Sequence, residues 1–390
     1  MPNATFDQRT RQLLAALRET GQYKHLQVLT SPMSAVVRME GFGEVIVLCS
    51  NNYLGLADHP EVIQAGIDGL NRYGAGTASV RFICGTFDCH RRIERAIARF
   101  VGAPAALTYV SCWNANEALF PTVAEENDVI LSDELNHASI IDGCRLVRKA
   151  ERAVYKHNDL ADLEARLKQY SGKDVRWVVT DGVFSMEGDT ANLPGLIELC
   201  RRYDAILVVD DSHGVGVLGP CGRGTPEHQG VLGQVDVLTG TLGKALGGAA
   251  GGYVAAADHV IDLLVQRSRP GLFSNALPAT VACSACKAIE IVEREPQRVA
   301  RLHANVRFMR DGLRRLGFEC AESPTAIIPI LIGDTAAAIA KSKRLLELGV
   351  FVIGFGFPVV PQGKARLRVQ VSAALETHHM EKALAAFAKL

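Results

Sequence analysis

The sequence has no excess of charge of one sign and no long hydrophobic run. Its 42 lysines and arginines balance its 42 aspartates and glutamates, and no block of like charge interrupts that balance. A basic stripe that could bind nucleic acid or anionic lipid is therefore absent, and small molecules are the expected partners. No apolar run reaches the roughly 18 residues of a membrane span, and the charged, amphipathic N-terminal helix has no hydrophobic signal core. We expect a cytoplasmic protein without a membrane or nucleic-acid partner.

Cysteine spacing gives neither a disulfide framework nor a metal site. The ten cysteines are scattered, most of them inside apolar segments, as expected for reduced thiols in a reducing compartment. Cys283 and Cys286 form a CxxC pair, but no second pair and no histidine pair accompanies it at zinc spacing. The pair lies in an alanine-rich helical stretch. We therefore predict a structural role for it and assign no metal ligands.

Short β-branched runs alternate with helical patterns through the middle of the chain, from about residue 60 to about residue 270. This alternation predicts an α/β domain whose largely parallel sheet is covered by helices on both faces. With 390 residues, of which 48% are hydrophobic, the chain is long enough to bury a large core. The seven runs are AALTYV, DVILS, RAVYK, RWVVTDG, AILVVD, VDVLTG and GGYVA.

The pattern changes beyond SRPGLFSNALP, where long helices are predicted over Ala279–Glu293 and Pro296–Leu316. The stretches AIIPILIG, GVFVIGFGFP and ARLRVQVS and a final helix follow, which together predict a smaller α+β domain. No repeat or low-complexity linker separates the two parts, so we expect them to pack tightly. The predicted division is an N-terminal helical arm with short strands over 1–48, a large α/β domain over 49–285 and a C-terminal domain over 286–390.

Polar residues directly after the apolar runs are the first candidates for a site, because ligands of open α/β sheets bind beyond the carboxyl ends of the strands. Asp210 ends one run and is followed by His213. Asp181 ends the preceding run and is followed by Ser185. Taken alone, these patterns also fit a helix-capping aspartate and an ordinary glycine turn.

Two other run ends add groups that can contact a ligand. Ser111, Cys112 and Trp113 precede a helix predicted to begin near Asn114, so their backbone N–H groups can hold an anion at its N-terminus. A capped helix with a core tryptophan is the alternative. His137 follows the DVILS run, although a single histidine is more often a satisfied structural residue.

Lys244 stands among glycines in TGTLGKALGG, and no other charged residue lies between Thr239 and Ala257. A lysine at the end of an apolar strand is costly to bury unless its amine has a function or a partner. Lys244 is therefore a candidate covalent carrier, with Thr239 and Thr241 as hydroxyl donors. A solvated surface lysine is the alternative.

Two segments resemble nucleotide-binding motifs, but each departs from its motif at residues that the binding site requires. The segment GVGVLG matches GxGxxG, but it begins beyond Asp210 and runs into PCGRGTPE, which cannot open the helix of an NAD site. The segment GTLGKA resembles a phosphate loop, but Leu238 replaces its first glycine and Ala245 replaces its serine or threonine. The sequence therefore argues against NAD binding and against nucleotide hydrolysis.

Pyridoxal phosphate (PLP) needs a carboxylate on its ring nitrogen, a lysine on its aldehyde and donors for its phosphate. Asp210 and Lys244 supply the first two. The chain resembles the α-oxoamine synthases, fold type I PLP-dependent transferases that join an amino acid to an acyl-CoA. The resemblance covers about residues 15 to 390 and rests on NNYLGLADHP, GAGTASVRFICGT, ELNHASIIDG, TDGVFSMEGD, VVDDSHGVGVLG and GKARLRVQVSA.

The resemblance implies a role for each candidate residue around the cofactor. Lys244 would bind PLP covalently, and Asp210 would pair with its pyridinium nitrogen and keep that nitrogen protonated. His213 and Ser185 would approach the phenolic oxygen, and His137 would stack on the ring.

The resemblance also implies how phosphate and substrate are held, in a homodimer with shared active sites. Asn51 and Arg368 would position the amino acid, and the planar guanidinium of Arg368 would bind its carboxylate. The phosphate would be held by backbone groups of Cys112 and Trp113 together with Thr241, aided by Ser274 of the partner subunit.

Within the family, VRFICGT, TGTLGKALGG, SRPGLFSN and FPVVPQGKARLR are most similar to the glycine C-acetyltransferase branch. This similarity implies condensation of glycine with acetyl-CoA to 2-amino-3-oxobutanoate and CoA, in threonine and glycine metabolism. The alternative is an 8-amino-7-oxononanoate synthase or another α-oxoamine synthase with a different acyl-CoA or amino acid. Leu375 departs from the family, which commonly has histidine there. A catalytically silent subunit is a third reading, but such a protein would be expected to lack Lys244.

Overall fold

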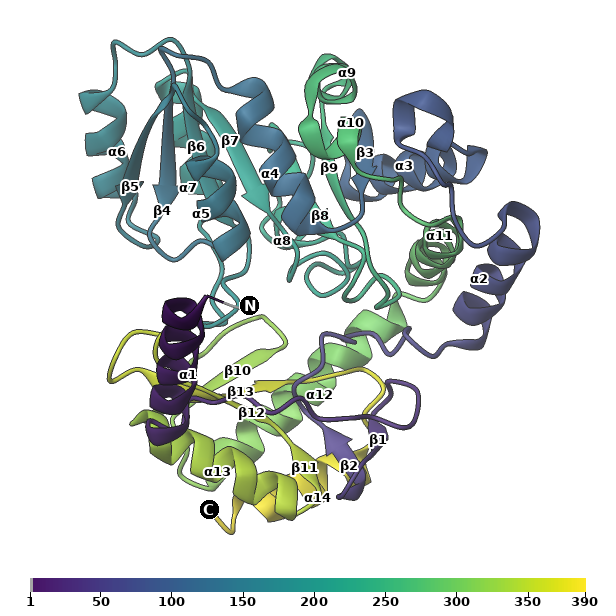
Figure 1. The fold of residues 1–390 in the computed structure, drawn as a ribbon, viewed down its shortest axis with the longest axis vertical. Helices are drawn as coiled ribbons and strands as arrows, with labels where there is room; N and C mark the ends of the chain where they lie inside the picture. Colours follow the sequence, from purple (N-terminus) through teal and green to yellow (C-terminus); the bar gives the residue numbers. More distant parts are fainter. Residues whose placement is uncertain (1–2) are drawn as a thin grey trace.

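Two lobes make up the chain, one around a seven-stranded sheet and one around two three-stranded sheets (Figure 1). The structure is a computed structural model that describes residues 3–390, so the first two residues of the predicted N-terminal arm lie outside the described range. None of the helices within that range combines the length and the apolarity that a bilayer crossing requires.

The strands are β1 (Val36–Met39), β2 (Gly43–Val47), β3 (Ala105–Tyr109), β4 (Val129–Asp133), β5 (Glu151–Tyr155), β6 (Arg176–Asp181), β7 (Ile206–Asp210), β8 (Val237–Thr241), β9 (Gly252–Ala256), β10 (Ile327–Gly333), β11 (Val350–Phe351), β12 (Ile353–Phe355) and β13 (Ala365–Gln370).

The helices are α1 (Ala4–Glu19), α2 (Pro60–Tyr73), α3 (Asp88–Val101), α4 (Cys112–Val123), α5 (Ala138–Arg145), α6 (Leu160–Gln169), α7 (Leu193–Arg202), α8 (Thr225–His228), α9 (Asp258–Arg267), α10 (Arg269–Phe273), α11 (Ala279–Arg294), α12 (Gln297–Arg315), α13 (Thr335–Glu347) and α14 (Thr377–Phe387), with a π-helical turn η1 (Arg81–Gly85).

All seven predicted runs form strands of one sheet, in the order β3-β9-β8-β7-β6-β4-β5. Strands β5, β4, β6, β7 and β8 run parallel to one another, and β9 lies antiparallel between β8 and β3. Strands β7 and β9 are buried along almost their whole length, because helices cover both faces of the sheet. The predicted fold class, a largely parallel seven-stranded sheet with helices on both faces, is confirmed.

Parallel pairing brings the carboxyl ends of four neighbouring strands to one edge of the sheet. The last residues of β4, β6, β7 and β8 are Asp133, Asp181, Asp210 and Thr241. Asp181 pairs directly with Asp210 across β6 and β7, and Asp210 pairs with Thr239 across β7 and β8. The polar candidates of the sequence are therefore gathered at this edge.

The smaller lobe combines both ends of the chain. Strands β10, β13 and β12 form an antiparallel sheet, while the β1–β2 hairpin takes β11 alongside β2 in parallel. The segment after β2 then lies along β13, since Gln370 N–H donates to the Leu48 carbonyl at 2.8 Å and Ala373 N–H donates to the Tyr53 carbonyl at 2.7 Å. These contacts place the residues around position 51 beside Arg368.

Helices α11 and α12 begin and end within about two residues of the predicted bounds. Helix α11 packs against α2 and α3 of the larger lobe. The domain boundaries at 48/49 and 285/286 stay predictions, and the second of them falls within α11. Helix α1 forms where the N-terminal helix is predicted, and none of its residues is buried.

Candidate active site

Asp210 ends β7 as a buried carboxylate that two short hydrogen bonds hold in place, with a longer one from Cys112 Sγ at 3.5 Å. Ser212 N–H donates to its Oδ1 at 3.0 Å, and the Asn116 amide donates to its Oδ2 at 2.7 Å. Burial alone would raise the pKa of Asp210, but these hydrogen bonds and the charge of Lys244 hold it below its usual value. Because its side chain is charged and only 4% exposed, Asp210 presents a fixed negative charge at the sheet edge.

His213 ends a hydrogen-bond chain that begins at Arg368 in β13. Arg368 Nη2 donates to Gln370 Oε1 at 3.0 Å, which fixes the orientation of the Gln370 amide. Gln370 Nε2 donates to the Tyr53 hydroxyl at 2.7 Å, and this hydroxyl lies 2.8 Å from His213 Nδ1. Burial lowers the pKa of His213 well below its usual value, so the ring is neutral. With Tyr53 donating to Nδ1, we assign the ring proton to Nε2.

His137 follows β4 and is the N-cap of α5. Its backbone N–H donates to Asp181 Oδ2 at 2.7 Å, and its Nδ1 accepts from Ser139 N–H at 3.2 Å. The Ser139 hydroxyl lies 2.8 Å from the same Nδ1 and also accepts from Asn116 at 2.9 Å. Asn116 therefore joins His137 and Asp210 in one network. Burial lowers the pKa of His137 below its usual value, which favours a neutral ring.

Lys244 lies three residues beyond the end of β8. No hydrogen bond to its amine is formed within residues 3–390, and burial lowers its pKa against the opposing charge of Asp210. A lysine amine with a lowered pKa is a better nucleophile and base at neutral pH. Thr241 Oγ1 accepts from the Gly243 N–H at 3.1 Å, while the hydroxyl of Thr239 is buried without a partner in the described part of the chain.

The N-terminus of α4 presents backbone N–H groups at the same edge. The helix begins at Cys112, two residues earlier than predicted, and the hydroxyl of its N-cap Ser111 accepts from Asn114 N–H at 3.1 Å. Trp113 N–H has no backbone acceptor among residues 3–390, while the bridge between Ser111 and Gly251 turns Cys112 N–H towards the Gly251 carbonyl. Gly252 allows β9 to lie against the start of α4, because a Cβ at this position would be 2.2 Å from the Cys112 nitrogen. The N-terminus of α4, with the free Trp113 N–H, suits an anion.

The remaining predicted residues fall into two groups. Asn51 Oδ1 accepts from Gln370 Nε2 at 2.7 Å, and the Ser185 carbonyl accepts from Arg368 Nη1 at 3.2 Å. The structure thus brings Asn51 and Ser185 to Arg368. Ser274 follows α10 and lines a small pocket beside the start of α4. Within residues 3–390, no hydrogen bond joins its side chain to the other predicted site residues.

Besides Ser139 and Ser212, three residues of this network were absent from the predicted site: Asn116, Tyr53 and Gln370. Asn116 lies one helical turn after Cys112, so a helix that begins there places it on the same face. Gln370 lies two positions after Arg368 on a strand, and alternate residues of a strand share a face. Helical and strand periodicity could therefore have found two of the three, whereas Tyr53 gave no comparable signal.

Comparisons with known proteins agree with this geometry. Residues 43–387 match the aminotransferase class I and II family. The chain is 47% identical over 379 residues to 2-amino-3-ketobutyrate coenzyme A ligase of Salmonella typhimurium, covering 97% of this chain and 95% of the relative. It is also 47% identical over 378 residues to 8-amino-7-oxononanoate synthase of Symbiobacterium thermophilum, covering 97% and 96%. A solved structure of a serine palmitoyltransferase variant from S. paucimobilis, with a bound PLP–myriocin aldimine, superposes with a TM-score of 0.92 at 30% identity, covering 99% of this chain and 97% of the other.

A mostly parallel seven-stranded sheet with a buried carboxylate, a lysine and a free helix N-terminus at one edge defines a fold type I PLP transferase. The family match over residues 43–387 and the relatives that align over nearly the full length identify the family within this class. The chain belongs to the aminotransferase class I and II family and, within it, to the α-oxoamine synthases.

Proposed function

We propose that this enzyme condenses glycine with acetyl-CoA and releases 2-amino-3-oxobutanoate and CoA. The observation that carries the proposal is the identity of 47% to a 2-amino-3-ketobutyrate coenzyme A ligase over nearly the full length of both chains. In this reaction the glycine Cα forms a bond to the acetyl carbonyl carbon while the carbon–sulfur bond of the thioester breaks. The Cα proton is removed, and the thiolate of CoA takes up a proton on release.

The residues present fit PLP at the sheet edge. The charged Asp210 suits a protonated ring nitrogen, and the backbone N–H groups at the N-terminus of α4, at Cys112 and Trp113, suit the phosphate. Thr241 pairs with Gly252, which lies against Cys112. Bound there, PLP supplies an aromatic ring that withdraws electrons from the amino-acid Cα. Lys244 is the residue that we propose binds it covalently.

His213, Ser185 and His137 complete the proposed cofactor contacts. In the assigned tautomer, His213 Nε2 carries a proton and can donate it in a hydrogen bond to the phenolic oxygen of PLP, near which Ser185 is also proposed to lie. The network through Ser139 restrains the His137 ring, which suits a group that stacks on an aromatic cofactor.

Arg368 and Lys244 act on the amino acid in this proposal. The Nε–H of Arg368 is buried and has no partner within residues 3–390. A substrate carboxylate can accept a hydrogen bond from this N–H group. Gln370 and Asn51 hold one side of that site. Lys244 Nζ, whose pKa burial lowers, is the base that takes the proton from glycine Cα.

We further propose a homodimer that shares its active sites through Ser274 of the partner subunit. Phe82, Ile83 and Phe273, which lie on η1 and α10, are 61%, 67% and 72% exposed, and these two segments pack together. A second copy would cover this apolar surface and bring its own Ser274 with it. Light scattering of dilute protein tests the point, and an active monomer would contradict the shared site.

An 8-amino-7-oxononanoate synthase is the second candidate, because such a relative shares 47% identity over the same span. Steady-state kinetics with acetyl-CoA and glycine, and with pimeloyl-CoA and alanine, separate the two. We expect the higher kcat/KM for acetyl-CoA with glycine, since each excess methylene or methyl in a closed pocket changes binding by about 1 to 3 kcal/mol. A higher kcat/KM for pimeloyl-CoA with alanine would assign the second function.

A further inference from the structure

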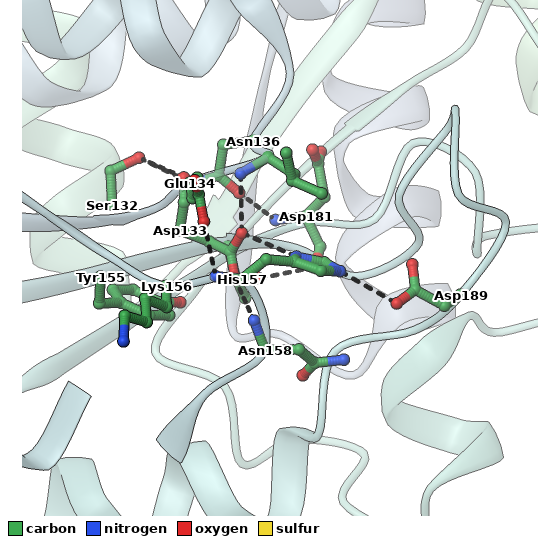
Figure 2. Close-up of polar contacts among 12 residues, drawn as sticks. Ser132, Asp133, Glu134, Asn136, Tyr155, Lys156, His157, Asn158, Asp181 and Asp189 are labelled. Carbon is green, nitrogen blue, oxygen red and sulfur yellow. Dashed lines mark hydrogen bonds and ion pairs between the residues drawn. The ribbon is translucent and has the colours of Figure 1, made fainter. Parts of the chain in front are cut away.

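His157, which has no role in the proposed active site, lies between the carboxylates of Asp133 and Asp189 (Figure 2). Its Nδ1 lies 3.0 Å from Asp133 Oδ1, and its Nε2 lies 3.0 Å from Asp189 Oδ2. A neutral imidazole carries one N–H and could donate to only one of them, so both contacts are satisfied by an imidazolium. Although burial lowers the pKa of His157, the hydrogen bonds to the two carboxylates raise it to about 10.

The two carboxylates differ in how firmly the rest of the chain holds them. Asp133 ends β4, has a side chain only 1% exposed and also accepts from the N–H groups of Leu135 and Asn158, both at 2.9 Å. Asp189 is 42% exposed and, within residues 3–390, accepts a side-chain hydrogen bond from His157 alone. His157 therefore ties a partly exposed carboxylate to one fixed at a strand end.

Asp189 belongs to a tight loop over 183–190. The loop is closed by a bridge between Val183 and Thr190 and by Phe184 N–H, which donates to the Asp189 carbonyl at 3.0 Å. The Phe184 ring packs edge-on to the His157 ring at 4.3 Å between centroids. His157 thus contacts the loop at both a charged and an aromatic residue.

Other carbonyls of this loop accept hydrogen bonds from β13 and from Thr325. The Ser185 carbonyl accepts from Arg368 Nη1 at 3.2 Å, and the Met186 carbonyl accepts from Arg366 Nη1 at 2.7 Å. The Gly188 carbonyl accepts from Thr325 Oγ1 at 2.7 Å. A shift of the loop would therefore move the partner of the arginine that we assign to the substrate carboxylate.

We propose that His157 is a positioning residue that bridges Asp133 and Asp189 and thereby holds the 183–190 loop where Ser185 meets Arg368. The assignment of a substrate role to Arg368 rests on the proposed function, whereas the restraint of the loop does not. His157 itself touches neither substrate nor cofactor in this proposal. Its effect is transmitted through Asp189 and the loop backbone.

A matched pair of substitutions at Asp189, whose side chain is 42% exposed, tests the bridge from the loop side. Asp189→Ala removes the acceptor on the loop. Asp189→Asn keeps it connected, because a neutral His157 can donate from Nδ1 to Asp133 and accept at Nε2 from the new amide N–H. His157→Gln removes the bridge from the other side, and His259→Gln, at an exposed position on α9, is the control.

Amide hydrogen exchange of the 183–190 segment is the first measurement, and it requires no turnover. We expect exchange at least about tenfold faster in Asp189→Ala and His157→Gln, and within about twofold of wild type in Asp189→Asn and His259→Gln. Unchanged exchange in both Asp189→Ala and His157→Gln, or equal acceleration in Asp189→Asn, would overturn the proposal.

The KM values of the PLP-loaded enzyme give the second measurement. We expect the KM for glycine to rise about tenfold in the two bridge-breaking variants, as for loss of a charge-assisted hydrogen bond, while the KM for acetyl-CoA stays within about twofold. Equal rises in both KM values would indicate a general structural effect and overturn the positioning role. If wild-type enzyme does not condense these substrates, the proposed function fails and the exchange result alone decides the role of His157.

Discussion

Asn116→Leu is the substitution that tests the site most directly, because Asn116 connects Asp210 with the Ser139–His137 pair. Its amide donates to Asp210 at 2.7 Å and to Ser139 at 2.9 Å, and the residue is only 1% exposed. Leucine has the same branching as asparagine, with methyl groups in place of the amide oxygen and nitrogen, and offers no donor. Asp210 would keep Ser212 N–H as its one strong donor and would lose the hydrogen bond that favours its charged form.

The expected loss follows from that single contact. A hydrogen bond to a charged group contributes about 2 kcal/mol, and the charged form of Asp210 is the one that a protonated ring nitrogen requires. Two kcal/mol corresponds to a factor of about thirty in a dissociation constant. We therefore expect the Kd for PLP of Asn116→Leu, measured by titrating cofactor-free protein and following absorbance, to rise about thirtyfold.

Asn305→Leu is the matched control. Asn305 is also buried, and its amide donates two hydrogen bonds of 2.9 Å, to the carbonyls of Ser372 and Leu375, in the smaller lobe. Both variants should lose stability, because each leaves buried acceptors unpaired. Only Asn116→Leu should lose cofactor affinity. A Kd for PLP within about twofold of wild type in Asn116→Leu, or an equal rise in Asn305→Leu, would refute the reasoning.

Three further predictions concern the charged groups. Lys244→Ala should fold but retain no cofactor after borohydride reduction, and peptide mapping of reduced wild type should mark Lys244; a label on another lysine would contradict its role. Asp210→Asn should lower kcat by at least about a hundredfold, roughly 3 kcal/mol, and near-normal turnover with bound PLP would disprove the charge argument. The pKa of His157 is raised from 6.5 to about 10 on folding, so its contribution to stability is complete below about pH 6.5 and is lost as the pH rises towards 10. Between pH 7 and pH 10, urea unfolding should show a steeper loss for wild type than for His157→Gln, and equal slopes would contradict the imidazolium.

The sheet and its functional edge could be predicted because their signals are local. The central strands, which are buried on both faces, read as apolar, β-branched runs, and all seven runs became strands. In a parallel sheet, the residue after each run must reach the same edge, so Asp181, Asp210 and Thr241 could be assigned to one site before any contact was known. Lys244 followed from its glycine-rich surroundings.

Contacts between distant segments could not be predicted in this way. The Tyr53 hydroxyl meets His213 across 160 positions and Gln370 across 317, and the β1–β2 hairpin takes β11 from the other end of the chain. Neither periodicity nor spacing in one sequence shows which segments meet after folding. His157 illustrates the same limit, because its two carboxylates come from segments on either side of it, one at a strand end and one in a loop.

A series of hydrogen bonds links the substrate side of the site to the cofactor side. It runs from Arg368 through Gln370 and Tyr53 to His213. Every link has a defined direction, since the guanidinium of Arg368 fixes the Gln370 amide and the amide fixes the donor role of Tyr53. The group proposed to bind the substrate carboxylate therefore also sets which nitrogen of His213 carries the proton. Reversing or removing one of these buried hydrogen bonds would leave a donor or an acceptor unpaired. Because Gln370 bonds to both Arg368 and Tyr53, its substitution should disturb both ends of the site together. Gln370→Leu is expected to raise the KM for glycine and the Kd for PLP, whereas an effect on only one of them would show that the two ends act independently.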